Sequence, residues 1–164
     1  MSILRILGVD PGSRITGFGV IEQLRGRQHY IGSGCIRVGN YPFHERLKHI
    51  FEGLSQVMSD YTPQVIALEQ IFVHKNVAST LKLAQARGIV MLVAALHGCM
   101  VQEYAPRRIK KAVVGFGGAD KKQVQQMIKA LFKLDGLPQV DAADALAVAL
   151  CHAQHHGLYQ KGVV

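Results

Sequence analysis

The sequence predicts an α/β fold in which a mixed sheet, partly antiparallel and partly parallel, is flanked by helices. Three observations predict it. Three strand-like segments follow one another in the N-terminal part of the chain, which is typical of an antiparallel meander. A strand, a helix and a further strand come next, and such a unit makes two strands parallel through a right-handed crossover. The last third of the chain shows mainly helical patterns.

The first predicted strand ends at a carboxylate. Positions 6–9 form an apolar run without polar alternation, which indicates a strand buried on both faces at the centre of a sheet. The run leads into Asp10, and the turn Pro11-Gly12 follows at once. A lone buried anion is costly, so we expect a cation, most simply a divalent metal, to balance Asp10.

Two more strand-like segments, at 16–21 and 30–38, flank the polar link at 25–28. With the first strand they complete the predicted meander. Glycines at positions 17, 19, 32 and 34 indicate bulges or places where another backbone approaches closely.

A helix is predicted over 43–58, where apolar residues recur at three- and four-residue intervals. Pro63 prevents further helix, and 65–69 is a short buried strand that ends in a second carboxylate, Glu69. Because this is the crossover unit, the strands that end at Asp10 and Glu69 are expected to be parallel neighbours.

A second helix is predicted over 76–96, and it is apolar nearly all round after Gly88. A helix without a polar face needs cover on every side. Either a second copy of the chain covers one side, which the frequency of two-fold oligomers favours, or the helix lies at the centre of a monomer.

A basic region follows the short strand predicted at 101–104. Its cations lie on two short helical segments separated by the glycine-rich link 115–118, and they are Arg107, Arg108, Lys110, Lys111, Lys121, Lys122 and Lys129. A solvated helix face is one interpretation of such a run. Since only Asp120 offsets the seven cations, contacts with phosphates are the better interpretation.

The last helix is predicted to open at Pro138, where the missing N–H does no harm. Asp141 and Asp144 follow at i and i+3, so that both carboxylates share one helix face. The apolar continuation indicates a helix that packs inward, and the alanines between the two acids permit close approach to the sheet.

Length and composition indicate one domain, which we place at 1–156 with a frayed tail at 157–164. The chain has 164 residues, of which 49% are hydrophobic, and its net charge is +8. If four of the eleven acids line one site, nineteen cations face only seven acids elsewhere, which favours a nucleic-acid partner. Three cysteines without metal-ligand spacing fit a reducing cytoplasm, and no apolar run reaches the roughly 20 residues of a membrane span.

Four carboxylates brought together would repel one another unless a cation sat among them. Oxygen ligands without Cys or His favour Mg²⁺, with Mn²⁺ as the alternative ion, over Zn²⁺. Two such ions can activate a water molecule and stabilise the leaving oxygen in the hydrolysis of a phosphodiester. A cap or a surface ion pair would explain each acid singly, but explains the set of four less well.

The chain resembles the RuvC family of bacterial Holliday-junction resolvases, in the RNase H-like superfamily, from about residue 3 to 152. The matching motifs, in order, are residues 8–14 (GVDPGSR), 69–72 (EQIF), 82–88 (KLAQARG) and 141–147 (DAADALA). The resemblance implies a mixed five-stranded sheet flanked by helices, and a homodimer whose two sites each nick one of two like-polarity strands of a four-way junction. It further implies dependence on Mg²⁺, 5′-phosphate and 3′-hydroxyl ends, a thymine-rich cognate tetranucleotide, and cooperation with the RuvA–RuvB branch-migration complex.

The resemblance also assigns residues. Asp10, Glu69, Asp141 and Asp144 match the catalytic, metal-binding acids of the family. Phe72 matches an aromatic that stacks on bases at the junction centre, although an aromatic just past a strand can equally be a core residue. Lys110 and Lys121 match lysines that handle DNA, and we add Arg14, Lys75, Arg107 and Lys122 as expected DNA contacts. The helix 76–96 matches the dimer helix, with Leu81, Leu83, Ala84 and Gly88 expected at the interface; Ala84 stands where we expect glycine.

Three alternatives remain. The same acids could serve a nuclease that cuts RNA–DNA hybrids, or the basic charge could belong to a non-catalytic protein that only binds junctions. The turn after Asp10 also resembles the phosphate-binding turn of actin-like ATPases, but those proteins need a second domain and a second turn. Finally, Cys151, His152, His155 and His156 have i, i+4 spacings that imitate a metal site, although histidines at a helix C-terminus need no metal to explain them.

Overall fold

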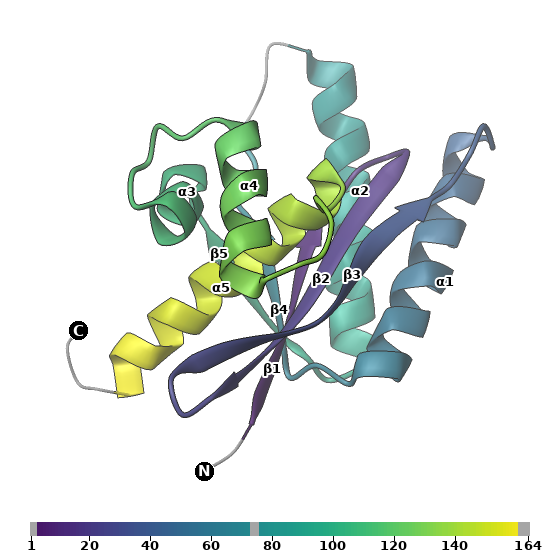
Figure 1. The fold of residues 1–164 in the computed structure, drawn as a ribbon. Helices are drawn as coiled ribbons and strands as arrows, with labels where there is room; N and C mark the ends of the chain where they lie inside the picture. Colours follow the sequence, from purple (N-terminus) through teal and green to yellow (C-terminus); the bar gives the residue numbers. More distant parts are fainter. Residues whose placement is uncertain (1–2, 73–75, 161–164) are drawn as a thin grey trace.

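A computed structural model describes residues 3–72 and 76–160, with the side chains of 157–160 excluded. Five strands form one sheet in the order β3-β2-β1-β4-β5 (Figure 1). The strands are β1 (Leu4–Asp10), β2 (Ile15–Leu24), β3 (Arg27–Arg37), β4 (Val65–Glu69) and β5 (Met100–Tyr104). The first three are antiparallel, whereas β1, β4 and β5 are parallel. The predicted mixed sheet is confirmed.

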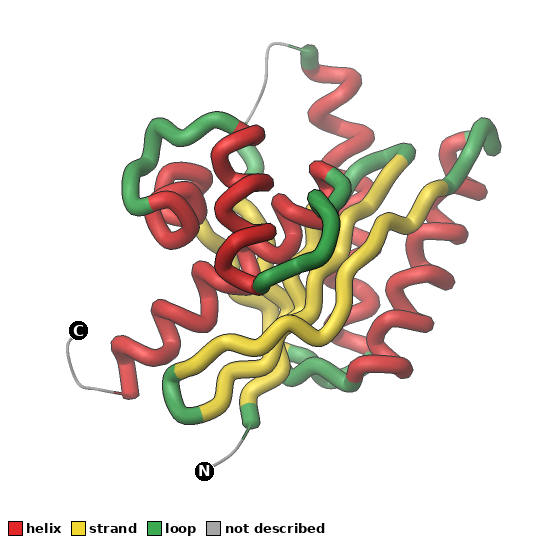
Figure 2. The backbone as a smooth tube through the Cα atoms, in the orientation of Figure 1, coloured by secondary structure: helices red, strands yellow, loops and turns green. Residues whose placement is uncertain are grey.

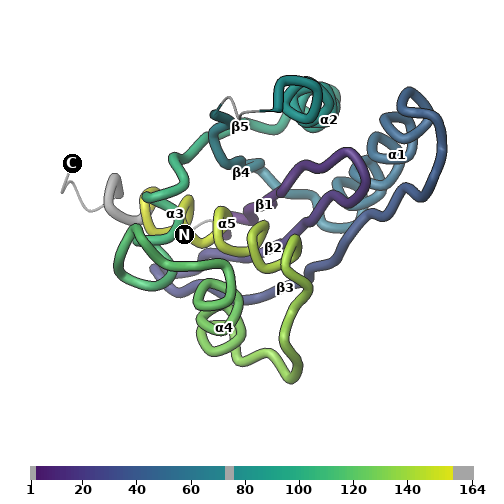
Figure 3. The backbone as a smooth tube through the Cα atoms, turned by 90° about the horizontal axis from the view of Figure 1, so that it is seen from above, coloured from purple at the N-terminus to yellow at the C-terminus, as the bar shows by residue number. Residues whose placement is uncertain are grey.

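Within the described residues, five helices cover the two faces of this sheet (Figure 2). They are α1 (Phe43–Tyr61), α2 (Val77–Leu96), α3 (Pro106–Val114), α4 (Lys121–Phe132) and α5 (Val140–Gln160). One core lies between the sheet and α1 and α2, and the other lies between the sheet and α5, with α3 and α4 packed on α5. Figure 3 shows α4 and α2 on opposite sides of α5 and the sheet.

The β2–β3 hairpin is tighter than the sequence indicates. Leu24 pairs with Arg27, so only Arg25 and Gly26 form the turn, both with positive φ. This is the backbone twist that two-residue hairpins favour. The prediction that the link extends to Gln28 was therefore wrong, because a glycine with φ of +77° lets the chain reverse within two residues. The register also shifts after Val20, which confirms a bulge.

The last helix begins later than predicted. Its first turn is closed by the Ala143 N–H donating to the carbonyl of Gln139 at 2.8 Å, and the helix runs from Val140. Pro138 therefore precedes the helix instead of opening it. Its carbonyl accepts a hydrogen bond from Gln125 of α4 at 2.6 Å, which holds the α4–α5 connection against the first half of α4.

Candidate active site

The two strand-terminal acids lie side by side and face the same helix. Val9 of β1 pairs with Leu68 of β4, so Asp10 and Glu69 end adjacent parallel strands. Successive residues of a strand point to opposite faces of the sheet. Ile6 on β1 and Ala67 on β4 pack in the core beneath α5. Asp10 and Glu69 follow them at even spacing, so both lie on the α5 face of the sheet.

The first turn of α5 lies unusually close to β1 and β2 because the strands carry glycines there. A Cβ atom added to Gly17 would lie 2.0 Å from the carbonyl oxygen of Asp141, and one added to Gly8 would lie 1.8 Å from that of Ala145. Gly17 is the β-sheet partner of Asp10. The backbone of Asp141 is thereby fixed over the strand pair that ends at Asp10, which confirms the close approach predicted from the glycines.

The electrostatics of the site show that the four carboxylates interact. The pKa of Asp10 is raised to about 7, most of all by burial and in addition by the neighbouring charges of Asp144, Asp141 and Glu69. Burial and the charge of Asp144 likewise raise the pKa of Glu69. Burial also raises the pKa of Asp144, with Asp141 adding to the shift. Like charges at close range have this effect, so these carboxylates lie near enough to one another for their charges to interact.

Two lysines from the neighbouring helices oppose this repulsion. Lys121, the first residue of α4, places its Nζ 3.4 Å from Oδ2 of Asp144. Its charge lowers the pKa of Asp10, Glu69 and Asp144, while Lys110 of α3 lowers those of Glu69 and Asp144. Two ammonium groups cannot neutralise four carboxylates, so the site keeps a net negative charge that favours a bound cation.

The donor set fits a hard divalent cation. All four acids supply oxygen, the ligand type that Mg²⁺ and Mn²⁺ prefer. As they are placed, no three His, Cys, Asp or Glu side chains within the described residues lie close enough together to hold an ion. Asp10, Glu69, Asp141 and Asp144 are the side chains that would hold the ion.

A small cavity of about 160 Å³ opens beside Asp10 and Glu69, and Phe72 lines it. The Phe72 side chain is 57% exposed. It is therefore not a core residue, and an exposed aromatic ring beside the acids is available to stack on a base.

Arg87 also lines this cavity, and the sequence analysis assigned it no role. Its guanidinium is buried, forms an ion pair with Glu103 of β5 and donates a hydrogen bond of 2.7 Å to the carbonyl oxygen of Glu69. Arg87 thus fixes the end of β4 from which the Glu69 side chain projects. The signal in the sequence was a single arginine among the apolar residues of α2.

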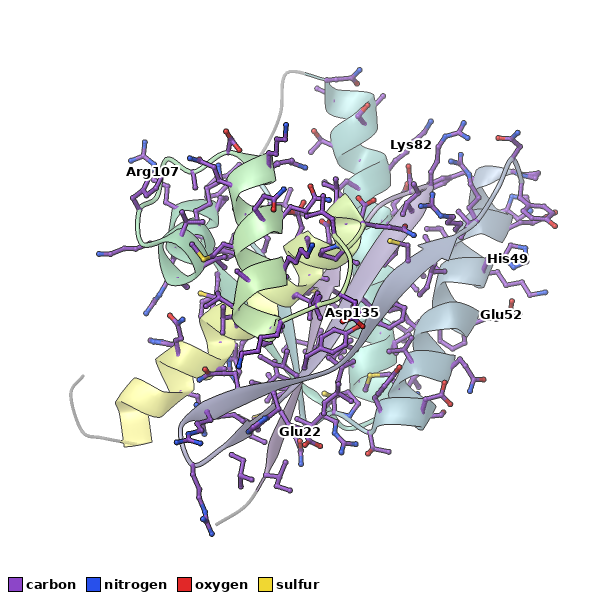
Figure 4. The ribbon with its side chains drawn as sticks, in the orientation of Figure 1. Glu22, His49, Glu52, Lys82, Arg107 and Asp135 are labelled. Carbon is purple, nitrogen blue, oxygen red and sulfur yellow. The ribbon has the colours of Figure 1, made fainter. Side chains whose placement is uncertain are left out.

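The other predicted DNA contacts are dispersed around the site. Arg107 and Lys122 are exposed on α3 and at the start of α4, and Figure 4 shows Arg107 at the outer edge of α3. Arg14 is exposed on the loop after β1 and donates a hydrogen bond of 3.0 Å to Asn40. Lys75 lies outside the described residues.

Helix α2 exposes much of its apolar surface. It is long and apolar enough to cross a membrane by length and composition, yet only 28% of its most apolar window is buried. Leu81 is 60% exposed, and Ala84 and Gly88 are exposed too. Leu83 differs, because it is half-buried and lines the cavity beside Asp10.

The histidines of α5 have protein partners. His152 is buried, and its Nδ1 lies 2.7 Å from the hydroxyl of Tyr104. Nδ1 of His155 accepts a hydrogen bond of 2.8 Å from Arg108. Burial lowers the pKa of His152 to about 4, so it is neutral at physiological pH. These contacts explain two of the histidines without a metal.

Comparison with known proteins assigns the family. The family model described as crossover junction endodeoxyribonuclease RuvC matches residues 6–152. A protein of that name from Tolumonas auensis is 54% identical over 148 residues, which cover 90% of this chain and 86% of the relative.

Solved structures agree with this assignment. The structure of T. thermophilus RuvC in complex with Holliday junction substrate has a TM-score of 0.87 and 28% identity, and the match covers 95% of this chain and 96% of that one. The yeast mitochondrial Holliday junction resolvase Ydc2 shares the fold, with a TM-score of 0.69 and 11% identity, over 98% of this chain and 86% of that one. The chain therefore belongs to the RuvC family of crossover junction endodeoxyribonucleases.

Proposed function

We propose that this protein is a metal-dependent endonuclease that resolves four-way DNA junctions. The observation that supports this most strongly is the proximity of Asp10, Glu69, Asp141 and Asp144, where burial and neighbouring carboxylates raise the pKa values of Asp10, Glu69 and Asp144. The basic helices beside them supply the complementary surface for DNA phosphates. The family membership and the likeness to a RuvC bound to junction substrate support the same substrate.

 In this proposal the four acids hold two Mg²⁺ ions in each active site. Such ions would supply the activation of a water molecule and the stabilisation of the leaving oxygen of a phosphodiester. Asp10 and Glu69 are held by the ends of two adjacent strands, and Asp141 and Asp144 by the first two turns of α5, so the backbone fixes the direction from which each carboxylate approaches. Mn²⁺ would replace Mg²⁺ at such a site.

The chain's other residues bind and orient the DNA in this proposal. Lys110 and Lys121, whose positive charges act to lower the pKa of Glu69, would hold the phosphates next to the scissile bond. Phe72 would stack on an unpaired base at the junction centre, since its ring is exposed at the rim of the acidic cavity. Arg14, Arg107 and Lys122 would contact phosphates farther away, and Lys75, outside the described residues, is also proposed as a DNA contact. The products would carry 5′-phosphate and 3′-hydroxyl ends.

We also propose that the active form is a homodimer that pairs two copies of α2. The exposed apolar residues of this helix are its main support, because a soluble domain rarely leaves a large apolar patch uncovered. Leu81, Ala84 and Gly88 are the proposed interface residues, and Leu83 would join the interface to the cavity beside Asp10. A dimer presents two acidic sites to one junction, as paired incision of like-polarity strands requires.

A membrane is a poorer partner for α2. One side of the helix packs into the core with α1, and Arg87 on that side is tied to Glu103 and to the end of β4. A helix surrounded by lipid would have to break these contacts.

We place the domain at 1–156 and propose that it acts in the cytoplasm. The RuvA–RuvB complex is the partner that the family resemblance implies.

A junction-cleavage assay tests the proposal. Purified protein is incubated with a synthetic four-way junction, an RNA–DNA hybrid and a linear duplex, each with Mg²⁺ or with a chelator. The proposal expects paired, symmetric nicks in the junction alone and only with Mg²⁺. Preferential cutting of the hybrid would favour the alternative nuclease, and tight junction binding without any nick would favour a non-catalytic binding protein.

A further inference from the structure

The loop between α3 and α4 presents a second exposed phenylalanine that the proposed function does not use. Phe116 is 50% exposed, close to the 57% of Phe72. It lies within the glycine-rich segment Gly115 to Gly118, between the two helices that supply the basic charge. An apolar ring within a cationic surface is complementary to a partner that has both negative charge and flat apolar faces.

The backbone of the loop is anchored on both sides of Phe116. Gly115 caps α3 with a φ of +95°, and its N–H donates to the carbonyl of Lys111 at 2.9 Å. At the other end Asp120 and Gln123 form a reciprocal capping box at the start of α4. Between these two caps, Gly117 lies so close to Arg107 that an added Cβ would be 3.3 Å from the Arg107 side chain. The backbone on both sides of Phe116 is thus anchored, which limits the entropy lost when the ring binds a partner.

The surroundings of the loop match a nucleic acid. Arg107 of α3 lies against the loop, and the cap Asp120 leads directly into Lys121 and Lys122. Lys121 in turn contacts Asp144 of the acidic site. The loop is therefore continuous with the proposed DNA surface, and a strand bound at the acids and at Lys121 would pass close to Phe116.

We propose that Phe116 is a second base-contacting aromatic, which stacks on an exposed base of the junction DNA held by α3 and α4. This inference rests on the proposed function and extends it. Phe72 precedes α2, on one face of the sheet, whereas Phe116 precedes α4, which packs on the α5 side. The two rings would contact the DNA on the two sides of the acidic site and so help to determine which phosphate lies over the acids. Phe116 acts as a positioning residue.

The test compares Phe116→Ala, Phe116→Leu and Phe116→Trp with a matched control, Leu131→Ala, whose side chain is 49% exposed on the same helix that follows the loop. Junction binding is measured by fluorescence anisotropy with a chelator present, so that cleavage does not interfere. Stacking predicts that the alanine variant binds about tenfold more weakly. The leucine variant should recover little of this loss, the tryptophan variant should recover all of it, and the control should bind like the parent.

Salt dependence and a fluorescent base separate stacking from other effects. The Phe116→Ala variant should keep the parent's slope of log Kd against log salt, because no phosphate contact is lost, whereas Lys122→Ala should reduce it by about one. A 2-aminopurine scan of the junction should find a base whose fluorescence is quenched by the parent and not by Phe116→Ala. Full binding by the alanine variant, or full recovery by leucine, overturns the inference. Failure of the parent itself to bind the junction would instead overturn the proposed function.

Discussion

Replacement of Asp10 by Asn tests how much the buried carboxylate destabilises the fold, separately from its role in strand cleavage. Burial and three neighbouring acids raise the pKa of Asp10 from 3.8 to about 7. A carboxyl group whose pKa is higher in the folded chain than in the unfolded chain destabilises the fold at every pH above its ordinary pKa. The penalty is absent below about pH 4, grows as the pH rises and is complete above about pH 7. A shift of this size corresponds to at most about 4 kcal/mol.

The Asn side chain keeps the shape and loses the charge, so the Asp10→Asn variant should be more stable than the parent in metal-free buffer. The difference should be largest at pH 8, where it should raise the melting temperature by about 10 °C, and should vanish near pH 4. Thermal unfolding at a series of pH values, with a chelator present, measures it. Added Mg²⁺ should narrow the gap, because the cation stabilises the parent more.

The same variant should bind a four-way junction with unchanged affinity and fail to nick it. Equal melting temperatures of the two proteins at pH 8, or a stability difference that does not depend on pH, would contradict the electrostatic reasoning. Nicking by the variant would contradict the assignment of Asp10 to the metal site.

Three further variants test other parts of the account. Lys121→Met should lower the melting temperature at pH 8 in metal-free buffer, because it removes a cation from the acids, and added Mg²⁺ should offset the loss. Lys122→Met serves as the control. Equal melting temperatures of the two variants would contradict a special role for Lys121. Gly17→Ala should lower the free energy of unfolding by about 1–3 kcal/mol and abolish nicking, because the new Cβ would lie 2.0 Å from the backbone of α5. Gly136→Ala, where no atom lies within 4 Å of the added Cβ, should change neither property. Chemical denaturation and the nicking assay measure both variants. Leu81→Glu should convert the proposed dimer to monomers in analytical ultracentrifugation, and an unchanged sedimentation coefficient would exclude α2 as the interface.

Much of the fold was predictable because strands and helices follow from local periodicity. The parallel pairing of β1 with β4, and hence the proximity of Asp10 and Glu69, follows from one crossover connection. The i, i+3 spacing of Asp141 and Asp144 required only that their segment be helical. These local rules were sufficient to bring the four acids to one end of the sheet.

The details that were missed depend on contacts between distant residues. Nothing near Pro138 in the sequence shows that its carbonyl bonds to Gln125 of another helix, so the start of α5 was placed too early. The role of Arg87 could be recognised only once the position of Glu103 on β5 was known. Whether Leu83 lines the cavity beside Asp10 depends on which face of α2 meets the sheet. Periodicity identifies a helix but does not fix which of its faces meets a functional site.

Crystals soaked in Mn²⁺ give the most direct test of the central claim, that the four carboxylates converge to bind a divalent cation. The account predicts anomalous density bounded by Asp10, Glu69, Asp141 and Asp144, with the Lys121 ammonium moved away from Asp144. Density at another place, or none at this site when the metal is in excess, would contradict it.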